Sequence, residues 1–287
     1  MKFCRFNDNR VGVVRDDVVY DVTEALDDLP SYRYAFPKGD PIVANLDTLR
    51  PRMEKLADRA DGIPVADVKF LSPVANPTKV IGVPQNYQDH ADEAVADVGI
   101  SQGAPQRKME DQGLFLKANS ALVGPSEGVA IRFPERRTDH EAELGMIIGR
   151  KGSNIAYDDA MSYVAGYAIA LDMVVRGKED RSFRKSVDSY AVLGPWMVTA
   201  DEITDPGNLD FSLEIANEMR QKNNTKNLIL DLPGQIVWAS KFYSLHPGDI
   251  IMSGTCAGVS QVQDGDVMHL KFEGIGAMDV PVRDHKA

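Results

Sequence analysis

The chain has 287 residues, of which 43% are hydrophobic, and it carries a formal net charge of −11 with a pI near 5.0. The length suits one large globular domain, or a large and a small one, with a substantial core. The acidic balance argues against a nucleic-acid backbone or an anionic membrane as the main partner. It leaves an anionic small molecule open, because a bound cation and a few basic residues reverse a local field.

Neither the start of the chain nor its cysteines indicate export. The opening MKFCRFNDNRVGVV lacks the apolar core and cleavage site of a signal peptide. No apolar run approaches the roughly 18 residues that a membrane span needs. Cys4 and Cys256 are far apart, so neither a disulfide framework nor a zinc–thiolate site is expected. We therefore expect a cytoplasmic protein.

Residues 1–72 are predicted to form a small N-terminal α/β domain. Residues 46–60 are a plausible short helix. The proline-rich stretch 72–77 is a connector, so we assign residues 73–287 to a second, catalytic domain. Short apolar segments divided by polar turns predict strands at 3–6, 11–14 and 18–22.

The rest of the chain is predicted to be rich in strands, which gives an α+β fold class overall. Asp89 is a candidate N-cap of a helix to about residue 97, and the polar stretch 99–113 is predicted to be a lid. Apolar residues at helical spacing predict helices at 158–171 and 232–243. Glycine-rich phosphate loops are absent. Predicted strands lie at 80–83, 115–117, 121–123, 196–199, 209–215, 249–252, 267–272 and 278–282.

The segment DHEAELGMIIG carries two acidic residues on a predicted strand, which ends in apolar and β-branched residues. Side chains alternate along a strand, so Glu141 and Glu143 point to one face while Ala142 points to the other. Neighbouring carboxylates repel unless a cation lies between them, which favours a divalent metal, with Asp172 as a further acidic residue downstream. The alternative is an exposed strand edge with two solvated glutamates.

Six segments combine charged, aromatic and glycine residues: NYQDHADE, FLKANSALVGP, DHEAELGMIIGR, YVAGYAIALDMVVR, KSVDSYAVLGPW and LHPGDIIMSGTCAGV. In order and spacing they resemble the motifs of the fumarylacetoacetate hydrolase family, from roughly Lys79 to the C-terminus. Residues 1–72 are similar to the small N-terminal domain of many bacterial members. The resemblance implies a mixed β-sandwich roll, usually a homodimer, and a divalent-metal enzyme acting on small 2-oxo or 2,4-dioxo acids.

On this resemblance, Glu141, Glu143 and Asp172 match the metal ligands of the family. Three carboxylates suit Mg²⁺ or Mn²⁺, which are hard ions that prefer oxygen. His90 and Glu93 match a catalytic dyad, in which the histidine activates a water and the glutamate orients its ring. The alternative for His90 is a histidine on the surface of a helix.

Further positions match residues around the substrate. Lys185 matches a catalytic lysine that stabilises an oxyanion or a developing enolate. Solvated surface lysines are the alternative for Lys185 and Lys117, Tyr87 is equally a candidate core aromatic, and the Gly254–Thr255 turn is equally a turn without a chemical role. The residues matched to substrate binding are Asn86, Tyr87, Lys117, Arg176, Glu179, Gly254 and Thr255.

Three positions depart from the family pattern where substrate choice would be set. Glu179 stands where glutamine is usual, and its charge would disfavour an acidic substrate tail unless Lys178, Arg181 or Arg184 offsets it. Cys256 replaces a proline, so the turn is less rigid or the thiol lines the pocket. The third departure is the loop NEMRQ, where N-G-E is common before R-Q.

The predicted function is a metal-dependent hydrolase that cleaves a C–C bond in a 2,4-dioxo acid, such as an acylpyruvate or fumarylpyruvate, through a metal-bound enolate. Water activated by His90 would add to the distal carbonyl. A lyase or isomerase acting on 2-oxo acids (a decarboxylase, a 2-oxo-dienoate hydratase or an enol–keto isomerase) is the alternative, because it needs the same metal site. A third interpretation is a binding module that has kept the fold without turnover. The sequence leaves the substrate and the choice of metal open.

Overall fold

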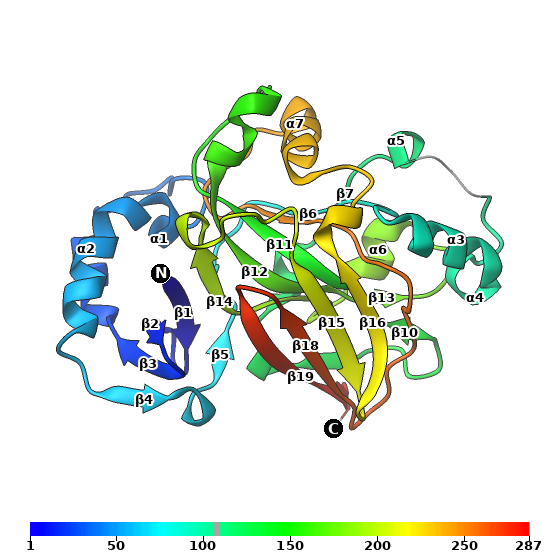
Figure 1. Ribbon diagram of the computed structural model, residues 1–287, viewed down its shortest axis with the longest axis horizontal. Helices are drawn as coiled ribbons and strands as arrows, with labels where there is room; N and C mark the ends of the chain where they lie inside the picture. The colour runs from blue at the N-terminus through cyan, green and yellow to red at the C-terminus, as the bar shows by residue number, and fades with distance from the viewer. Residues whose placement is uncertain (106–108, 287) are drawn as a thin grey trace.

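The computed structural model describes residues 1–105 and 109–286, and Figure 1 shows its arrangement. In these residues, a mixed sheet of 12 strands runs through the molecule. Two of the strands lie beside its main path: β5 (Phe70–Leu71) pairs with β1 (Lys2–Phe6), and β8 (Leu122–Val123) pairs with β14 (Ala191–Thr199). The path of the sheet is β4 (Gly62–Pro64), β3 (Val18–Asp21), β2 (Arg10–Arg15), β1 (Lys2–Phe6), β14 (Ala191–Thr199), β12 (Val164–Asp172), β11 (Ala142–Ile148), β17 (Ile250–Met252), β6 (Val80–Gly82) and β7 (Phe115–Lys117).

A second sheet of five strands packs against the first through a shared hydrophobic core. Its strands alternate exposed and buried residues, as in β18 (Val267–Phe272), because one face contacts the core and the other faces solvent. β10 (Thr138–Asp139) and β13 (Val174–Val175) form a separate pair. The order of the five strands is β16 (Glu218–Asn224), β15 (Asp210–Ile215), β18, β19 (Gly276–Asp284) and β9 (Val129–Ile131).

Short helices connect and cover these strands. α7 (Leu232–Phe242) begins where Asp231 caps the Gly234 N–H at 2.9 Å, with Pro233 in the first turn. None of the described helices is both long and apolar enough to cross a bilayer. The other α-helices are α1 (Pro41–Ala44), α2 (Leu46–Ala57), α3 (Gln88–Ala96), α4 (Val98–Ser101), α5 (Met109–Gln112) and α6 (Arg181–Lys185). The 3-10 helices are Thr23–Asp28, Val65–Asp67, Asn119–Ala121, Pro125–Glu127, Tyr157–Tyr163, Ala200–Glu202 and Thr225–Asn227.

The N-terminal segment is joined to the rest through the large sheet. β1 pairs with β14 in antiparallel register, so that Phe3 lies opposite Met197. Figure 1 shows α2 and the first strands (blue) at one end of the molecule and α3 with α4 at the other. The boundary after residue 72 stays a prediction, although the sheet continues across it.

Two local predictions are wrong. Residues 158–171 form a 3-10 helix and then strand β12, not one helix. β12 is buried almost throughout, and a strand that is buried on both faces gives an apolar run without an alternation to reveal it. Asp89 is not an N-cap: α3 starts one residue earlier, and the Asp89 carboxylate accepts the His90 N–H within the first turn.

The remaining local predictions agree with the structure or lie partly outside it. The helices expected at 46–60 and 232–243 are confirmed as α2 and α7. The stretch expected to be a loop at 99–113 contains most of α4 and all of α5. Residues 106–108 lie outside the described residues, and the lid role stays a prediction.

Candidate metal centre

Three carboxylates converge where two central strands end. Glu143 belongs to β11, and Glu141 is the residue directly before this strand. Asp172 is the last residue of β12, and its backbone N–H donates to the Glu141 carbonyl at 2.9 Å. One oxygen from each side chain lies within 4.8 Å of the others. Glu141 is 5% exposed, Glu143 2% and Asp172 1%, so the alternative of a solvated strand edge is wrong.

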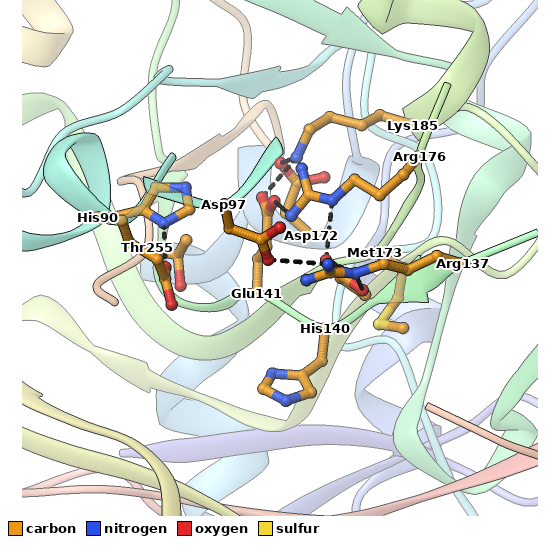
Figure 2. A network of polar contacts seen from close by, with 12 residues as sticks. His90, Asp97, Arg137, His140, Glu141, Asp172, Met173, Arg176, Lys185 and Thr255 are labelled. Atoms are coloured by element: carbon orange, nitrogen blue, oxygen red, sulfur yellow. Dashed lines mark hydrogen bonds and ion pairs between the residues drawn. The ribbon is translucent and has the colours of Figure 1, made fainter. Parts of the chain in front are cut away.

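Basic side chains contact two of the three carboxylates (Figure 2). Lys185 Nζ donates to Glu141 Oε2 at 2.5 Å and to Asp172 Oδ2 at 2.6 Å. Lys117 Nζ donates to Asp172 Oδ1, and Arg176 Nη2 donates to Glu141 Oε1 at 3.2 Å. Both lysines are buried, so the surface alternative for them is also wrong. Their charges offset those of carboxylates that would be costly to bury alone.

Glu143 lacks this support. At Glu141, burial opposes ionisation, but Lys185 and Arg176 outweigh it and lower the pKa to about 2. At Glu143, burial and the neighbouring carboxylates raise the pKa well above its usual value. Among the described residues no basic side chain pairs with Glu143, whose carboxylate accepts the Gly254 N–H at 2.7 Å.

The donor set fits a divalent cation. All three donors are carboxylates, which Mg²⁺ and Mn²⁺ prefer to nitrogen or sulfur. A cation among them would supply the positive charge that Glu143 lacks. Glu141, Glu143 and Asp172 are thus the residues that would hold it.

The predicted dyad forms on α3. His90 Nδ1 lies 2.9 Å from Glu93 Oε2, and Glu93 Oε1 accepts the Gly258 N–H at 2.8 Å. The i,i+3 spacing brings the two side chains together on one helix face. His90 is only 5% exposed, so it is not a surface histidine. Figure 2 shows it on the opposite side of Glu141 from Lys185.

Asn86 and Tyr87 lie in the protein interior. The Asn86 amide donates to the carbonyls of Leu230 and Ser253 at 3.0 and 2.8 Å, and its oxygen accepts the Leu230 N–H at 2.7 Å. Tyr87 is 1% exposed and packs edge-on against Phe211, as the core alternative expects. A substrate contact by either residue stays a prediction.

The turn at Gly254 and Thr255 contacts the metal-ligand strand. Gly254 has φ +98°, and a Cβ there would lie 2.5 Å from the Cβ of Asn86, so only glycine fits. Its N–H binds Glu143, while the Thr255 hydroxyl donates to the Ala142 carbonyl at 2.9 Å. The turn therefore has a role in positioning β11, and substrate contact remains a prediction.

Two of the sequence departures have a structural explanation. Cys256 is fully buried and donates to the Ala257 carbonyl, and burial raises the pKa of its thiol to about 12. The Cys256 thiol therefore does not line the surface of a pocket. Glu179 is offset by Arg136, which binds both of its carboxylate oxygens at 3.0 and 2.8 Å.

Sequence reasoning missed an ionic chain that leads from Arg137 to the metal centre. Arg137 binds Asp97 at 2.9 Å and Asp139 at 2.7 Å, and Asp139 accepts from Arg176 at 2.8 Å (Figure 2). Asp97 caps α4, next to the helix that carries His90. The alternation of basic and acidic residues in RRTDHEAE was the available signal.

Gln221 of the smaller sheet was also missed. Its Oε1 accepts the Ala142 N–H at 3.0 Å and lies 3.1 Å from His140 Nδ1. Its Nε2 donates to Thr255 Oγ1 at 2.7 Å and to the Cys256 carbonyl at 2.8 Å. One amide thus joins the strand of the metal ligands to the turn that binds Glu143. Its place at the end of NEMRQ was the only sequence signal.

The comparisons with known proteins place this fold and its buried acidic site in a class of metal-dependent hydrolase. Residues 79–283 match the family described as Fumarylacetoacetate (FAA) hydrolase C-terminal, and the chain belongs to this family. It is 52% identical to maleylpyruvate hydrolase of Aquipseudomonas alcaligenes, over 99% of both chains. It is 34% identical to a mitochondrial oxaloacetate tautomerase of Xenopus laevis, over 76% of this chain and 69% of that protein.

A solved structure agrees over the whole length. Maleylpyruvate hydrolase from Sphingobium sp. SYK-6, crystallised with manganese(II) and pyruvate, superposes with a TM-score of 0.84 at 38% identity, over 99% of both chains. The predicted family, the strand-rich α+β fold and an enzyme of the hydrolase class are thereby confirmed. The expected cofactor, Mg²⁺ or Mn²⁺, agrees with that manganese complex and with the acidic triad.

Proposed function

We propose that this protein hydrolyses maleylpyruvate or a closely similar acylpyruvate to pyruvate and a dicarboxylic acid. The observation that carries the proposal is the convergence of three buried carboxylates, with His90 and its partner Glu93 across from Lys185. Identity over nearly the full length of a maleylpyruvate hydrolase supports the choice of substrate.

A divalent cation held by Glu141, Glu143 and Asp172 would supply Lewis-acid polarisation of the 2-oxo acid end of the substrate. Lys185 lies against two of these carboxylates and provides an ammonium group for the oxyanion. Arg176 adds a second fixed positive charge beside Glu141. Both cations are held in place before substrate arrives, so the site needs little reorganisation as charge develops.

His90 acts as the general base. Glu93 accepts the hydrogen bond of Nδ1–H, which leaves Nε2 to take a proton from water. The resulting hydroxide adds to the distal carbonyl of the substrate. The C–C bond to the pyruvyl carbon then breaks, its electron pair stays on that carbon, and the imidazolium returns the proton there. The acyl part leaves as a carboxylic acid, so one water is consumed in each turnover.

The test is a hydrolysis assay on Mn²⁺-loaded protein, with maleylpyruvate as substrate and chromatography of maleate and pyruvate as the readout. His90→Ala should lower kcat by about 100-fold or more, as expected for loss of a general base. Mn²⁺ binding should persist, because His90 is not among the three carboxylates. The matched control is His269→Ala, which changes an exposed side chain of β18. Unchanged turnover in His90→Ala would remove the dyad from the mechanism.

A second candidate is enol–keto isomerisation of a 2-oxo acid. The 34% identity to oxaloacetate tautomerases favours it, since it covers most of the chain. The same preparation incubated with oxaloacetate tests this second function, because an isomerase changes the enol absorbance faster than Mn²⁺ alone does in the same buffer.

We also propose a catabolic homodimer in the cytoplasm. Large exposed apolar side chains support an interface between copies, among them Tyr34 at 95%, Phe36 at 70% and Phe242 at 69% exposure. Light scattering after size exclusion measures the mass directly, and a monomer at micromolar concentration would contradict the dimer.

A further inference from the structure

A shallow, basic cavity on the surface shares one residue, Arg176, with the metal centre. Its volume is about 790 Å³. Arg176 belongs both to this cavity and to the metal centre, because its Nη2 contacts Glu141. Four of the lining residues are basic and one is acidic, an unusual balance in a chain with an excess of acidic residues. The lining residues are Gln102, Arg136, Arg137, Arg176, Gly177, Lys178 and Glu179.

Two of these cations remain available to a ligand. Arg176 is 8% exposed and uses Nε and Nη2 on Asp139 and Glu141, while its Nη1 has no partner among the described residues. Lys178 is exposed and forms no ion pair in the part of the chain that the structure describes. Arg137, in contrast, is already matched by carboxylates.

Arg136 and Glu179 neutralise each other at the cavity wall. Arg136 binds both oxygens of Glu179 at 3.0 and 2.8 Å and also donates to the Arg176 carbonyl at 2.8 Å. Gly177 makes room for this pair. A Cβ at that position would lie 2.0 Å from Arg136 Nη2 and 2.2 Å from Glu179 Oε2. A side chain at residue 177 would therefore collide with the Arg136–Glu179 pair.

We propose that this cavity is the subsite for the distal carboxylate of a dicarboxylic acylpyruvate, with Arg136 as the residue that prevents Glu179 from repelling it. The inference rests on the proposed function and names the substrate tail that the site selects. Arg176 contacts Glu141 of the metal centre and also lines the cavity, so a substrate whose 2-oxo acid end lies at the metal would place its tail in this cavity. Arg176 and Lys178 then supply the charge that the tail meets.

The test compares two substrates, maleylpyruvate with a distal carboxylate and acetylpyruvate without one. Arg136→Gln should lower the ratio of their kcat/KM values by about tenfold, because a freed Glu179 repels only the charged tail. Arg136→Gln combined with Glu179→Gln should restore the ratio. An unchanged ratio in the single variant, or a lack of recovery in the double variant, overturns the role of the Arg136–Glu179 pair.

The matched control is Arg132→Gln, which breaks an exposed pair with Asp188 outside the cavity and should leave the ratio as it is. Calorimetry of Mn²⁺-loaded protein gives a readout that needs no turnover. Wild type should bind 2-oxoadipate about tenfold more tightly than 2-oxohexanoate, which lacks the second carboxylate. Equal affinities overturn the subsite. If neither acylpyruvate is hydrolysed while this preference holds, the proposed function fails and the subsite stands.

Discussion

Glu141 and Glu143 have the same side chain on one strand face but opposite electrostatic surroundings. Basic partners lower the pKa of Glu141, whereas burial and neighbouring carboxylates raise that of Glu143. Glu143→Gln should therefore leave metal-free stability equal or higher, because a neutral amide is cheaper to bury than an unpaired carboxylate. The same variant should lose most of the stabilisation by Mn²⁺, which for a bound ligand at 100 times its Kd is about 2.7 kcal/mol.

Thermal unfolding with Mn²⁺ and with a chelator measures both effects. The control is Glu218→Gln on the exposed end of β16, which should respond to Mn²⁺ as wild type does. A Glu143→Gln protein whose Tm rises with Mn²⁺ as much as that of wild type would show that this carboxylate is not a ligand.

At the scale of residues, the sequence predicts which side chains share a face of one strand, but it predicts few contacts between side chains of different elements. The period of two along a strand is enough to predict that Glu141 and Glu143 share a face. The same period cannot show that Lys117 and Lys185 are buried, because these lysines lie on β7 and α6 while their partner Asp172 lies on β12. Only the family resemblance placed these residues at one site.

At the scale of elements, burial on both faces hides the type of element. The strand β12 has only one residue that is not buried, so its sequence shows no alternation, and a helix fits its apolar residues equally well. Helix α7 was predictable because Asp231 and Pro233 mark its start. Contacts between sheets, such as those of Gln221, leave no periodic pattern along the strand.

Gln221 should position the metal-ligand strand. Gln221→Met keeps the approximate volume but leaves the Ala142 N–H and the Thr255 hydroxyl without this partner, at about 1–3 kcal/mol for each buried group. Because these groups flank both glutamates of the site, Mn²⁺ affinity should fall together with stability. Titration with Mn²⁺, followed by calorimetry at a temperature where the variant is folded, measures the affinity.

Gln235→Met on α7 is the matched control. Gln235 is also fully buried, but its amide donates to Leu230 and its oxygen has no partner among the described residues. This variant should change stability without changing Mn²⁺ affinity. Equal affinity losses in the two variants would mean that Gln221 acts only through general stability.

At the scale of the whole molecule, one sheet connects the N-terminal segment to the metal centre. β1 pairs with β14, β14 with β12, and β12 with β11, so two strands separate the N-terminal strand from the one that carries Glu143. A hydrophobic core crosses the same boundary, where Phe3 and Leu49 belong to one cluster with Met197.

This continuity predicts that the two parts unfold together. Scanning calorimetry of the full chain should give one cooperative transition, and Mn²⁺ should raise its Tm as a whole, because the core and the β1–β14 pairing couple the segments. Deletion of residues 1–72 would expose the edge of β14 and the apolar side chains behind it, so residues 73–287 alone should aggregate or lose near-UV dichroism. Two separate transitions, with only the second shifted by Mn²⁺, would instead show that residues 1–72 are an autonomous domain whose pairing with β14 contributes little to the stability of the metal site.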